Sequence, residues 1–175
     1  MKEAERIRLI LSDIDGVMTD GKIIHDSRGN EIKEFSARDG FGIRLWMKNG
    51  GLFGIVTGRE SKVVEIRAGE LGVELLEQGI VDKAETVRRI TSRLGVPLEE
   101  TAFIGDDYPD LPALKTVGFP AAVADAADEI RDAAVWVSDV PGGKGAVRQL
   151  IETILKAQGR WDGAIRFYRG GSKVF

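Results

Sequence analysis

Short apolar runs alternate with segments of helical periodicity along most of this chain, and this alternation strongly constrains the fold. Runs rich in leucine and β-branched residues predict buried strands at 7–11, 52–56, 73–76 and 102–104, with weaker strands near 121–123 and 135–137. Helical patterns follow at about 40–48, 61–71, 82–94, 111–117 and 146–157. Strands and helices at these spacings suit right-handed βαβ crossovers, so we expect an α/β fold with a mainly parallel sheet.

Two segments depart from the alternation. Residues 22–36 carry two short strand-like stretches around the turn-rich segment 26–30, which predicts a β-hairpin with a five-residue loop. Asp39 follows the hairpin and is expected to cap the next helix. Residues 159–175 mix aromatic residues and arginines with glycines, and we expect an extended arm there. The predicted organisation is one domain over 1–158, with the hairpin inserted, and a tail over 159–175.

Composition excludes several kinds of site. The chain has no cysteine and a single histidine, so disulfides, thiolate sites and histidine-based zinc sites are ruled out. That histidine, His25, is expected on the hairpin surface with no catalytic role. The net charge of −3 gives no basic excess for nucleic acid. The N-terminus is charged and no apolar stretch approaches the roughly 20 residues of a membrane span, so a cytoplasmic protein with no nucleic-acid or membrane partner is expected.

Reactive side chains follow the predicted strands, at the edge where open α/β sheets bind their ligands. They are Asp13 and Asp15 after the first strand, Thr57 and Arg59 after the second, Lys83 in the helix after the third, and Asp106, Asp107 and Asp110 after the fourth. A single aspartate at such a position is often a turn former or a helix cap, and a lone lysine is often a surface residue. Because such side chains follow these four predicted strands, the pattern as a whole favours a ligand-binding site.

Five carboxylates at one edge would repel one another unless a cation were bound. Carboxylate and carbonyl oxygens suit Mg²⁺ far better than zinc or copper. A lysine and a threonine beside them suit a phosphate group. The residues therefore predict a magnesium site next to a phosphate site.

The motifs resemble a known superfamily. In order and spacing, the haloacid dehalogenase superfamily is matched by residues 13–17 (DIDGV), 57–59 (TGR), 83 (K) and 105–110 (GDDYPD). One subgroup, the 3-deoxy-D-manno-octulosonate 8-phosphate phosphatases, is further resembled at 15–21 (DGVMTDG), 38–44 (RDGFGIR) and 142–148 (GGKGAVR). The resemblance covers about residues 7–158. It implies a Rossmann-like three-layer sandwich in which a small hairpin takes the place of a cap domain.

The resemblance also implies the chemistry: hydrolysis of a sugar-acid phosphate monoester through an aspartyl-phosphate. Asp13 would be the nucleophile and Asp15 the general acid and base. Mg²⁺ would be held by Asp13, the backbone carbonyl of Asp15 and Asp106. Around them, Asp107 and Asp110 would orient these ligands, while Thr57, the Gly58 amide and Lys83 would neutralise the phosphoryl oxygens.

Because no separate cap domain is expected, substrate selectivity is expected to come from other parts of the protein. Neither 16–56 nor 58–82 leaves room for a separate cap domain, because predicted elements fill both stretches. Expected substrate contacts are Gly16, Gly58, Arg59 and Arg67, with the guanidinium groups suited to a sugar carboxylate. The resembled family forms homotetramers through hairpins, which makes the hairpin and the tail arginines candidates for covering a neighbouring site.

Two alternatives stay open at this point. A nine-carbon substrate, 3-deoxynononate 9-phosphate, would use the same chemistry, although Arg59 after Thr57-Gly58 favours the eight-carbon one. A non-catalytic phospho-acceptor resembling a receiver domain, or an assembly module, belongs to a different class. A receiver carries its aspartate after the third strand, where this chain has Glu77-Gln78-Gly79, and it lacks a counterpart of Asp15.

Overall fold

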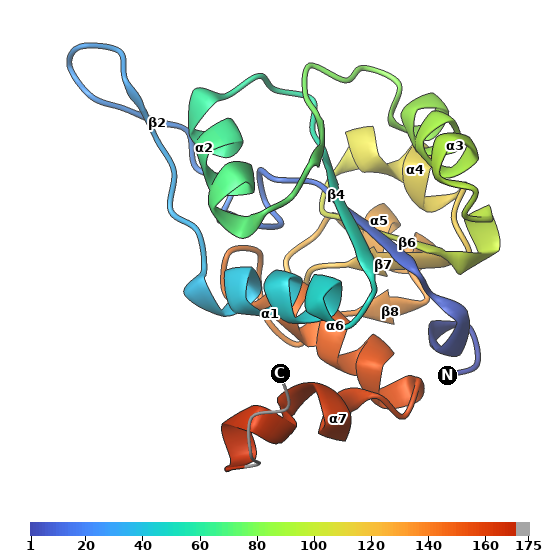
Figure 1. The fold of residues 1–175 in the computed structure, drawn as a ribbon. Coiled ribbons are helices and arrows are strands. Elements are labelled where there is room, and N and C mark those ends of the chain that lie inside the picture. Colours follow the sequence, from blue (N-terminus) through green and yellow to red (C-terminus); the bar gives the residue numbers. More distant parts are fainter. Residues whose placement is uncertain (171–175) are drawn as a thin grey trace.

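The computed structural model describes residues 1–170, which form a six-stranded sheet with strand order β5-β4-β1-β6-β7-β8 (Figure 1). The strands are β1 (Leu9–Ser12), β4 (Leu52–Val56), β5 (Leu75–Glu77), β6 (Thr101–Gly105), β7 (Phe119–Ala122) and β8 (Trp136–Val137). Every neighbouring pair in this sheet is parallel. The prediction of an α/β fold with a mainly parallel sheet is confirmed.

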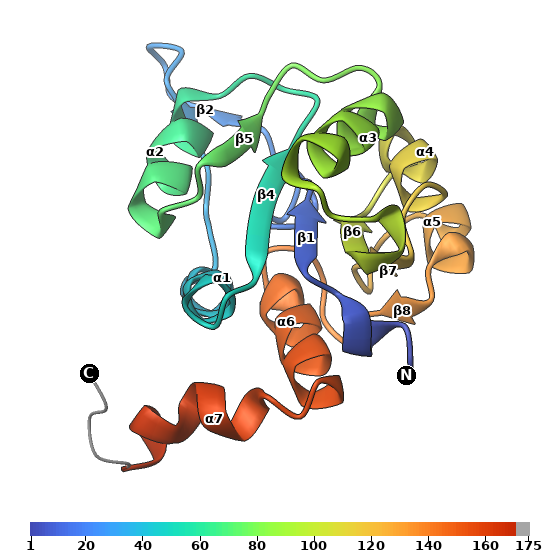
Figure 2. The ribbon, with the colours of Figure 1, turned by 45° about the vertical axis from the view of Figure 1, so that its right-hand side comes forward.

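Helices cover both faces of the sheet, which gives three layers (Figure 2). One face carries α1 (Ala37–Lys48), α2 (Lys62–Leu71) and α6 (Ala146–Ala157), and the other α3 (Lys83–Leu94), α4 (Leu111–Leu114) and α5 (Asp128–Ala133). The sequence did not predict α5, a short polar helix that buries only Ile130. Short 3₁₀ turns are η1 (Ala4–Arg6), η2 (Leu98–Glu100), η3 (Tyr108–Asp110) and η4 (Arg166–Arg169).

The centre of the sheet is its most buried part. All residues of β1 and β6 are buried, as expected for parallel strands covered on both faces. Leu11 of β1 pairs in register with Gly54 of β4 on one side and with Phe103 of β6 on the other. This packing fixes the point at which the chain leaves β1 and β6, and therefore the position of the side chains that come next.

The predicted hairpin is confirmed. Its antiparallel strands are β2 (Ile24–His25) and β3 (Glu31–Ile32), joined by the five residues 26–30. The carboxylate of Asp26 accepts hydrogen bonds from the amides of Arg28 (2.8 Å) and Asn30 (2.9 Å), which stabilises the turn. The tip of the hairpin projects away from the body of the protein (Figure 1).

The predicted cap of the first helix is wrong. Helix α1 begins at Ala37 and its N-cap is Ser36, whose hydroxyl accepts a hydrogen bond from the Asp39 amide. Asp39 is therefore free to face α6, where its carboxylate accepts a hydrogen bond from the Arg148 amide at 2.7 Å. The aspartate thus serves the N-terminus of a distant helix and ties α1 to α6.

The expectation of an extended tail is also wrong. Helix α7 (Trp161–Ile165) follows α6, and η4 follows α7. The Trp161 ring lies 5.6 Å from the Arg148 guanidinium carbon and 5.2 Å from Lys156 Nζ, while Tyr168 meets Phe41 edge to face at 5.1 Å. The aromatic rings find partners on α1 and α6, so the chain folds back there. Residues 171–175 of the predicted tail lie outside the described part.

Across residues 1–170, no helix is both long enough and apolar enough to cross a membrane.

Candidate active site

The carboxyl ends of β1, β4 and β6 open onto a cavity of about 310 Å³. Crossovers leave β1 and β6 toward opposite ends of the sheet, and such a switch point creates a crevice. The cavity is lined by Asp13, Asp15, Gly21, Thr57, Gly58, Arg59, Lys83, Asp106, Asp107, Pro109 and Asp110. The structure therefore brings together all the residues predicted for the site except Gly16 and Arg67.

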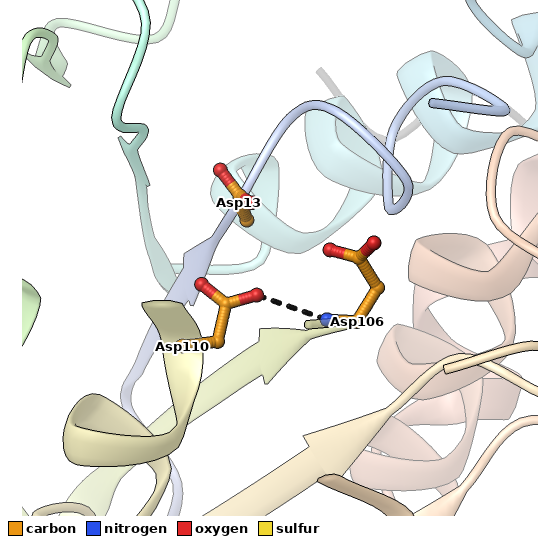
Figure 3. A group of neighbouring side chains, drawn as sticks. All are labelled: Asp13, Asp106 and Asp110. Carbon is orange, nitrogen blue, oxygen red and sulfur yellow. Dashed lines mark hydrogen bonds between the residues drawn. The ribbon is translucent and has the colours of Figure 1, made fainter. Parts of the chain in front are cut away.

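Three of the carboxylates form a tight group (Figure 3). One oxygen each of Asp13, Asp106 and Asp110 lies within 4.8 Å of the others. Asp13 directly follows β1, held by a 3.1 Å hydrogen bond from its amide to the Ile104 carbonyl, and Asp106 directly follows β6. Parallel pairing of the two strands thus sets these two aspartates side by side.

Asp110 reaches the same group from η3 and is held by protein donors. Its Oδ2 accepts hydrogen bonds from the amides of Asp106 (2.9 Å) and Asp107 (3.4 Å), the first of which is drawn in Figure 3. Its Oδ1 accepts a hydrogen bond from Lys83 Nζ at 2.5 Å. Because both oxygens are engaged, Asp110 is suited to holding its neighbours in place, whereas Asp13 and Asp106 are better placed to bind a cation.

Lys83 is buried in the first turn of α3, where Asp82 caps the helix. Its Nζ lies 3.0 Å from Asp13 Oδ1 as well as contacting Asp110. Burial alone would lower the pKa of Lys83, but the carboxylates of Asp13 and Asp110 outweigh it and raise the pKa. Lys83 therefore stays positively charged beside Asp13 and Asp110.

The single charge of Lys83 does not neutralise the three carboxylates of Asp13, Asp106 and Asp110. Burial, with repulsion from Asp110, raises the pKa of Asp13 to about 6 despite the ion pair with Lys83. Burial and repulsion from Asp110, Asp13 and Asp107 raise the pKa of Asp106 to about 8. A hard divalent cation would relieve this repulsion, and the all-oxygen donor set fits Mg²⁺.

Thr57 and Arg59 form the opposite wall. Thr57 follows β4 and is buried, and its amide donates a 3.0 Å hydrogen bond to the Glu77 carbonyl. Arg59 lies nearer the opening, with Nη1 3.6 Å from Asp15 Oδ2. The wall thus presents a hydroxyl and a guanidinium to a ligand beside Asp15.

Two hairpin residues at this site were missed in the sequence. Lys33 pairs with Asp15 Oδ1, and Glu31 Oε1 lies 3.0 Å from Arg59 Nη2. The available signal was the period of two in a strand, which puts residues 31 and 33 on one face and Ile32 on the other. The sequence alone did not show that the first of these faces turns toward the strand ends.

The structure does not bring Arg67 into the cavity. On α2 it pairs with Glu70 at 2.9 Å and its guanidinium carbon lies 5.7 Å from the centre of the Phe35 ring. It lines a separate cavity of about 720 Å³ between α1 and α2. Its predicted contact with substrate remains a prediction that these contacts do not favour.

Gly16 lies against Asp106, and its lack of a side chain leaves room for the Asp106 carboxylate. Its φ is +92°, and a Cβ built there would overlap the Asp106 carboxylate. We expect Gly16→Ala to weaken Mg²⁺ binding about tenfold or more, because the displaced carboxylate would no longer be oriented for the ion. Titration calorimetry with Mg²⁺ measures the change.

Gly29→Ala is the matched control for this variant. Gly29 also has a positive φ, +84°, but apart from its chain neighbours no atom of residues 1–170 lies within 4 Å of the position that a Cβ would take there. The control should carry the same backbone strain and keep the parent affinity. Equal affinities for the Gly16→Ala variant and the parent would contradict the assignment of Asp106 to the ion.

Comparison with known proteins gives a consistent result. Residues 66–150 match a family of haloacid dehalogenase-like hydrolases. The 3-deoxy-D-manno-octulosonate 8-phosphate phosphatase of Salmonella typhi is 40% identical over 164 residues, which cover 94% of this chain and 87% of that protein. The Yersinia pestis phosphatase of the same name is 41% identical, with 94% and 88% covered.

Solved structures agree with the sequence relatives. The Moraxella catarrhalis 3-deoxy-D-manno-octulosonate 8-phosphate phosphatase, in complex with magnesium ion, phosphate ion and KDO, superposes with a TM-score of 0.93 at 39% identity, covering 95% of this chain and 96% of that one. A cobalt-bound phosphatase from Haemophilus influenzae superposes with a TM-score of 0.89 at 38% identity, covering 91% and 94%.

Proposed function

The chain belongs to the 3-deoxy-D-manno-octulosonate 8-phosphate phosphatase family of haloacid dehalogenase-like hydrolases, and we propose that it hydrolyses this sugar-acid phosphate to the free sugar acid and phosphate. One observation carries the proposal. Asp13, Asp15, Thr57, Lys83 and Asp106, from four separate segments of the chain, line one cavity at the strand ends.

The proposed reaction has two steps. A carboxylate oxygen of Asp13 attacks phosphorus while the bond from phosphorus to the sugar oxygen breaks, and Asp15 protonates that oxygen as it leaves. Asp15 then accepts a proton from water, whose oxygen attacks the aspartyl-phosphate at phosphorus. The bond between phosphorus and Asp13 breaks, which releases phosphate and restores the carboxylate of Asp13 and the protonated carboxyl group of Asp15.

Other residues of the cavity stabilise charge. Thr57, the Gly58 amide and Lys83 are positioned at the cavity wall to contact the oxygens of the transferring phosphoryl group. Lys83 is already held by Asp13 and Asp110, so little rearrangement is needed. Such preorganised donors stabilise the transition state more than flexible ones.

Magnesium is the proposed cofactor. Asp13, Asp106 and the backbone carbonyl of Asp15 would hold it, with Asp107 and Asp110 as orienting residues. When bound, Mg²⁺ supplies positive charge that offsets the carboxylates and the phosphoryl oxygens. The raised pKa values of Asp13 and Asp106 support this assignment, because burial and then repulsion between the carboxylates raise them, and the ion would relieve that repulsion.

Arg59 is the proposed contact for the substrate carboxylate. It lies at the cavity opening with its side chain 40% exposed, and guanidinium groups bind carboxylates through two parallel hydrogen bonds. The arginine favours an eight-carbon over a nine-carbon sugar acid. The alternative of a non-catalytic phospho-acceptor predicts at most one phosphate released per protein.

A substrate panel tests the function. Purified protein with Mg²⁺ should show its highest kcat/KM on 3-deoxy-D-manno-octulosonate 8-phosphate, compared with 3-deoxynononate 9-phosphate, hexose phosphates and an aryl phosphate. Phosphate release measures turnover. A higher kcat/KM on the nine-carbon compound would reassign the substrate, and release that stops at one phosphate per protein would favour the phospho-acceptor.

We also propose that the chain forms a homotetramer through its hairpins. Three hairpin isoleucines support this, because Ile23, Ile24 and Ile32 are 52%, 37% and 47% exposed on a projecting element. Clustered apolar side chains of this kind favour burial against a partner. The same hairpins would bring neighbouring subunits close to each cavity.

Ile32→Asp should break this assembly, because a charge would be buried at the interface. Light scattering after size exclusion should give a smaller mass than that of the parent. Ile66→Asp, at an isoleucine on α2 that is 55% exposed against 47% for Ile32, should leave the mass unchanged. A tetrameric Ile32→Asp variant would argue against the hairpin as the interface.

A further inference from the structure

The base of the hairpin brings two charged side chains against Asp15 and Arg59, which line the catalytic cavity. Glu31 lies in β3 and Lys33 directly follows it, so both side chains point to the same side while Ile32 points outward. The Lys33 side chain is only 1% exposed, and the Glu31 side chain is 16% exposed. A lysine this deeply buried needs anionic partners, since an unpaired buried charge is strongly unfavourable.

Lys33 and Arg59 together hold the carboxylate of Asp15. Lys33 Nζ donates a hydrogen bond to Asp15 Oδ1, whereas Arg59 Nη1 lies 3.6 Å from Asp15 Oδ2, beyond hydrogen-bond distance, so Oδ2 stays available to a leaving oxygen. Glu31 Oε1 joins the two cations, at 3.4 Å from Lys33 Nζ and 3.0 Å from Arg59 Nη2. The four groups form a closed ring of alternating charge.

The ring is anchored to the body of the protein. Ser61 Oγ donates a hydrogen bond to Glu31 Oε2, and Ser61 is the N-cap of α2, where its hydroxyl also accepts from the Val64 amide at 3.3 Å. The hairpin base is thus fixed to a helix terminus even though its tip projects into solvent. Because the hairpin base is fixed in this way, Lys33 has a defined position beside Asp15.

We propose that Lys33, held by Glu31, is a positioning residue that orients the carboxyl group of Asp15 for proton delivery to the leaving oxygen. The inference rests on the proposed function, in which Asp15 is the general acid. Proton transfer requires the donor within hydrogen-bond reach of the leaving oxygen, and a small displacement lowers the rate steeply. A hairpin thereby performs part of the work of a cap domain, without covering the cavity.

Leaving groups distinguish this role from simple docking of the hairpin. Benzyl phosphate has a poor leaving group that needs protonation, whereas 4-nitrophenyl phosphate has a good leaving group that does not. Neither compound carries a carboxylate, so a loss of sugar-acid binding at Arg59 does not affect the comparison. The quantity to compare is kcat/KM, which covers the steps up to departure of the leaving group.

Lys33→Met should lower kcat/KM on benzyl phosphate about tenfold or more and change it less than about threefold on 4-nitrophenyl phosphate. Glu31→Gln, which keeps the shape of the side chain, should shift the ratio in the same direction. Lys22→Met is the control, because Lys22 belongs to the same insertion and pairs with Asp20 in solvent. Its ratio should equal that of the parent.

Each other outcome has a defined meaning. Equal losses on both substrates, or no loss, would overturn the positioning role of Lys33. If Lys33→Met does not fold, as judged by circular dichroism, the Glu31→Gln ratio decides the question. Absence of turnover of every phosphate ester by the unaltered protein would instead overturn the proposed function.

Discussion

Asp13→Asn is expected to abolish phosphate release, with a loss in kcat/KM of about 10⁴-fold or more. An amide is a far weaker nucleophile than a carboxylate, so the first step of the proposed reaction would be lost. Phosphate release from the substrate with the highest parent kcat/KM measures the loss. Asp162→Asn is the control, because Asp162 pairs with Arg169 on the protein surface.

The same substitution should stabilise the fold in the absence of metal. The pKa of Asp13 is raised to about 6, so its ionised form is less favourable in the folded state than in the unfolded chain. Removing the charge above that pH removes the penalty, and the melting temperature at pH 8 should rise. Retained turnover would exclude Asp13 as the nucleophile, and an unfolded variant would show that its charge is needed for the fold.

Metal and pH should act together on stability. The folded pKa values of Asp13 and Asp106 are about 6 and about 8, both above the usual 3.8. Groups with raised folded pKa values contribute fully below pH 4 and lose their contribution as the pH rises through 6 and 8. The melting temperature of chelator-treated protein should therefore fall between pH 5 and pH 8.5.

Mg²⁺ should reverse this loss where the carboxylates are ionised. At a concentration about 100 times its Kd, the ion should add about 2.7 kcal/mol, or about 5–10 °C in melting temperature at pH 8, with little effect at pH 4.5. Scanning calorimetry with and without EDTA measures both changes, and phosphate release should stop with EDTA and return with Mg²⁺. Asp106→Asn should flatten the pH dependence and remove most of the Mg²⁺ shift.

A pH dependence that persists in full in the Asp106→Asn variant would assign it to other groups. Turnover that is indifferent to EDTA would contradict the metal assignment directly.

The sequence was informative where function depends on the residues directly after a strand. Continuous apolar runs predict buried parallel strands, and Asp13, Thr57 and Asp106 come immediately after such runs. Neighbouring parallel strands end at the same edge, so adjacency along the sheet converts separate motifs into one cavity. The order of residues along the chain was enough to predict where these three side chains lie, because each follows directly after a strand whose position the sheet fixes.

Segments without a buried strand beside them were predicted less well. Ser36 rather than Asp39 caps α1, and the Asp39 carboxylate instead accepts a hydrogen bond from the Arg148 amide of α6, a residue that is distant in sequence. The tail folds against α1 and α6 because Trp161 and Tyr168 find side chains that are far away in sequence. These contacts join residues that are distant in sequence, so a local sequence pattern does not predict them.

The sequence by itself therefore determined the parallel sheet, the hairpin and the acidic strand ends, because each depends on the order of neighbouring residues. Only the tertiary structure decided that Arg67 lies away from the cavity and that Lys33 pairs with Asp15, which lines it. The physical reason is that the position of a charged side chain depends on the charged groups that lie close to it in the folded protein. For Lys33 those are Asp15 and Glu31, which the folded hairpin base places around it.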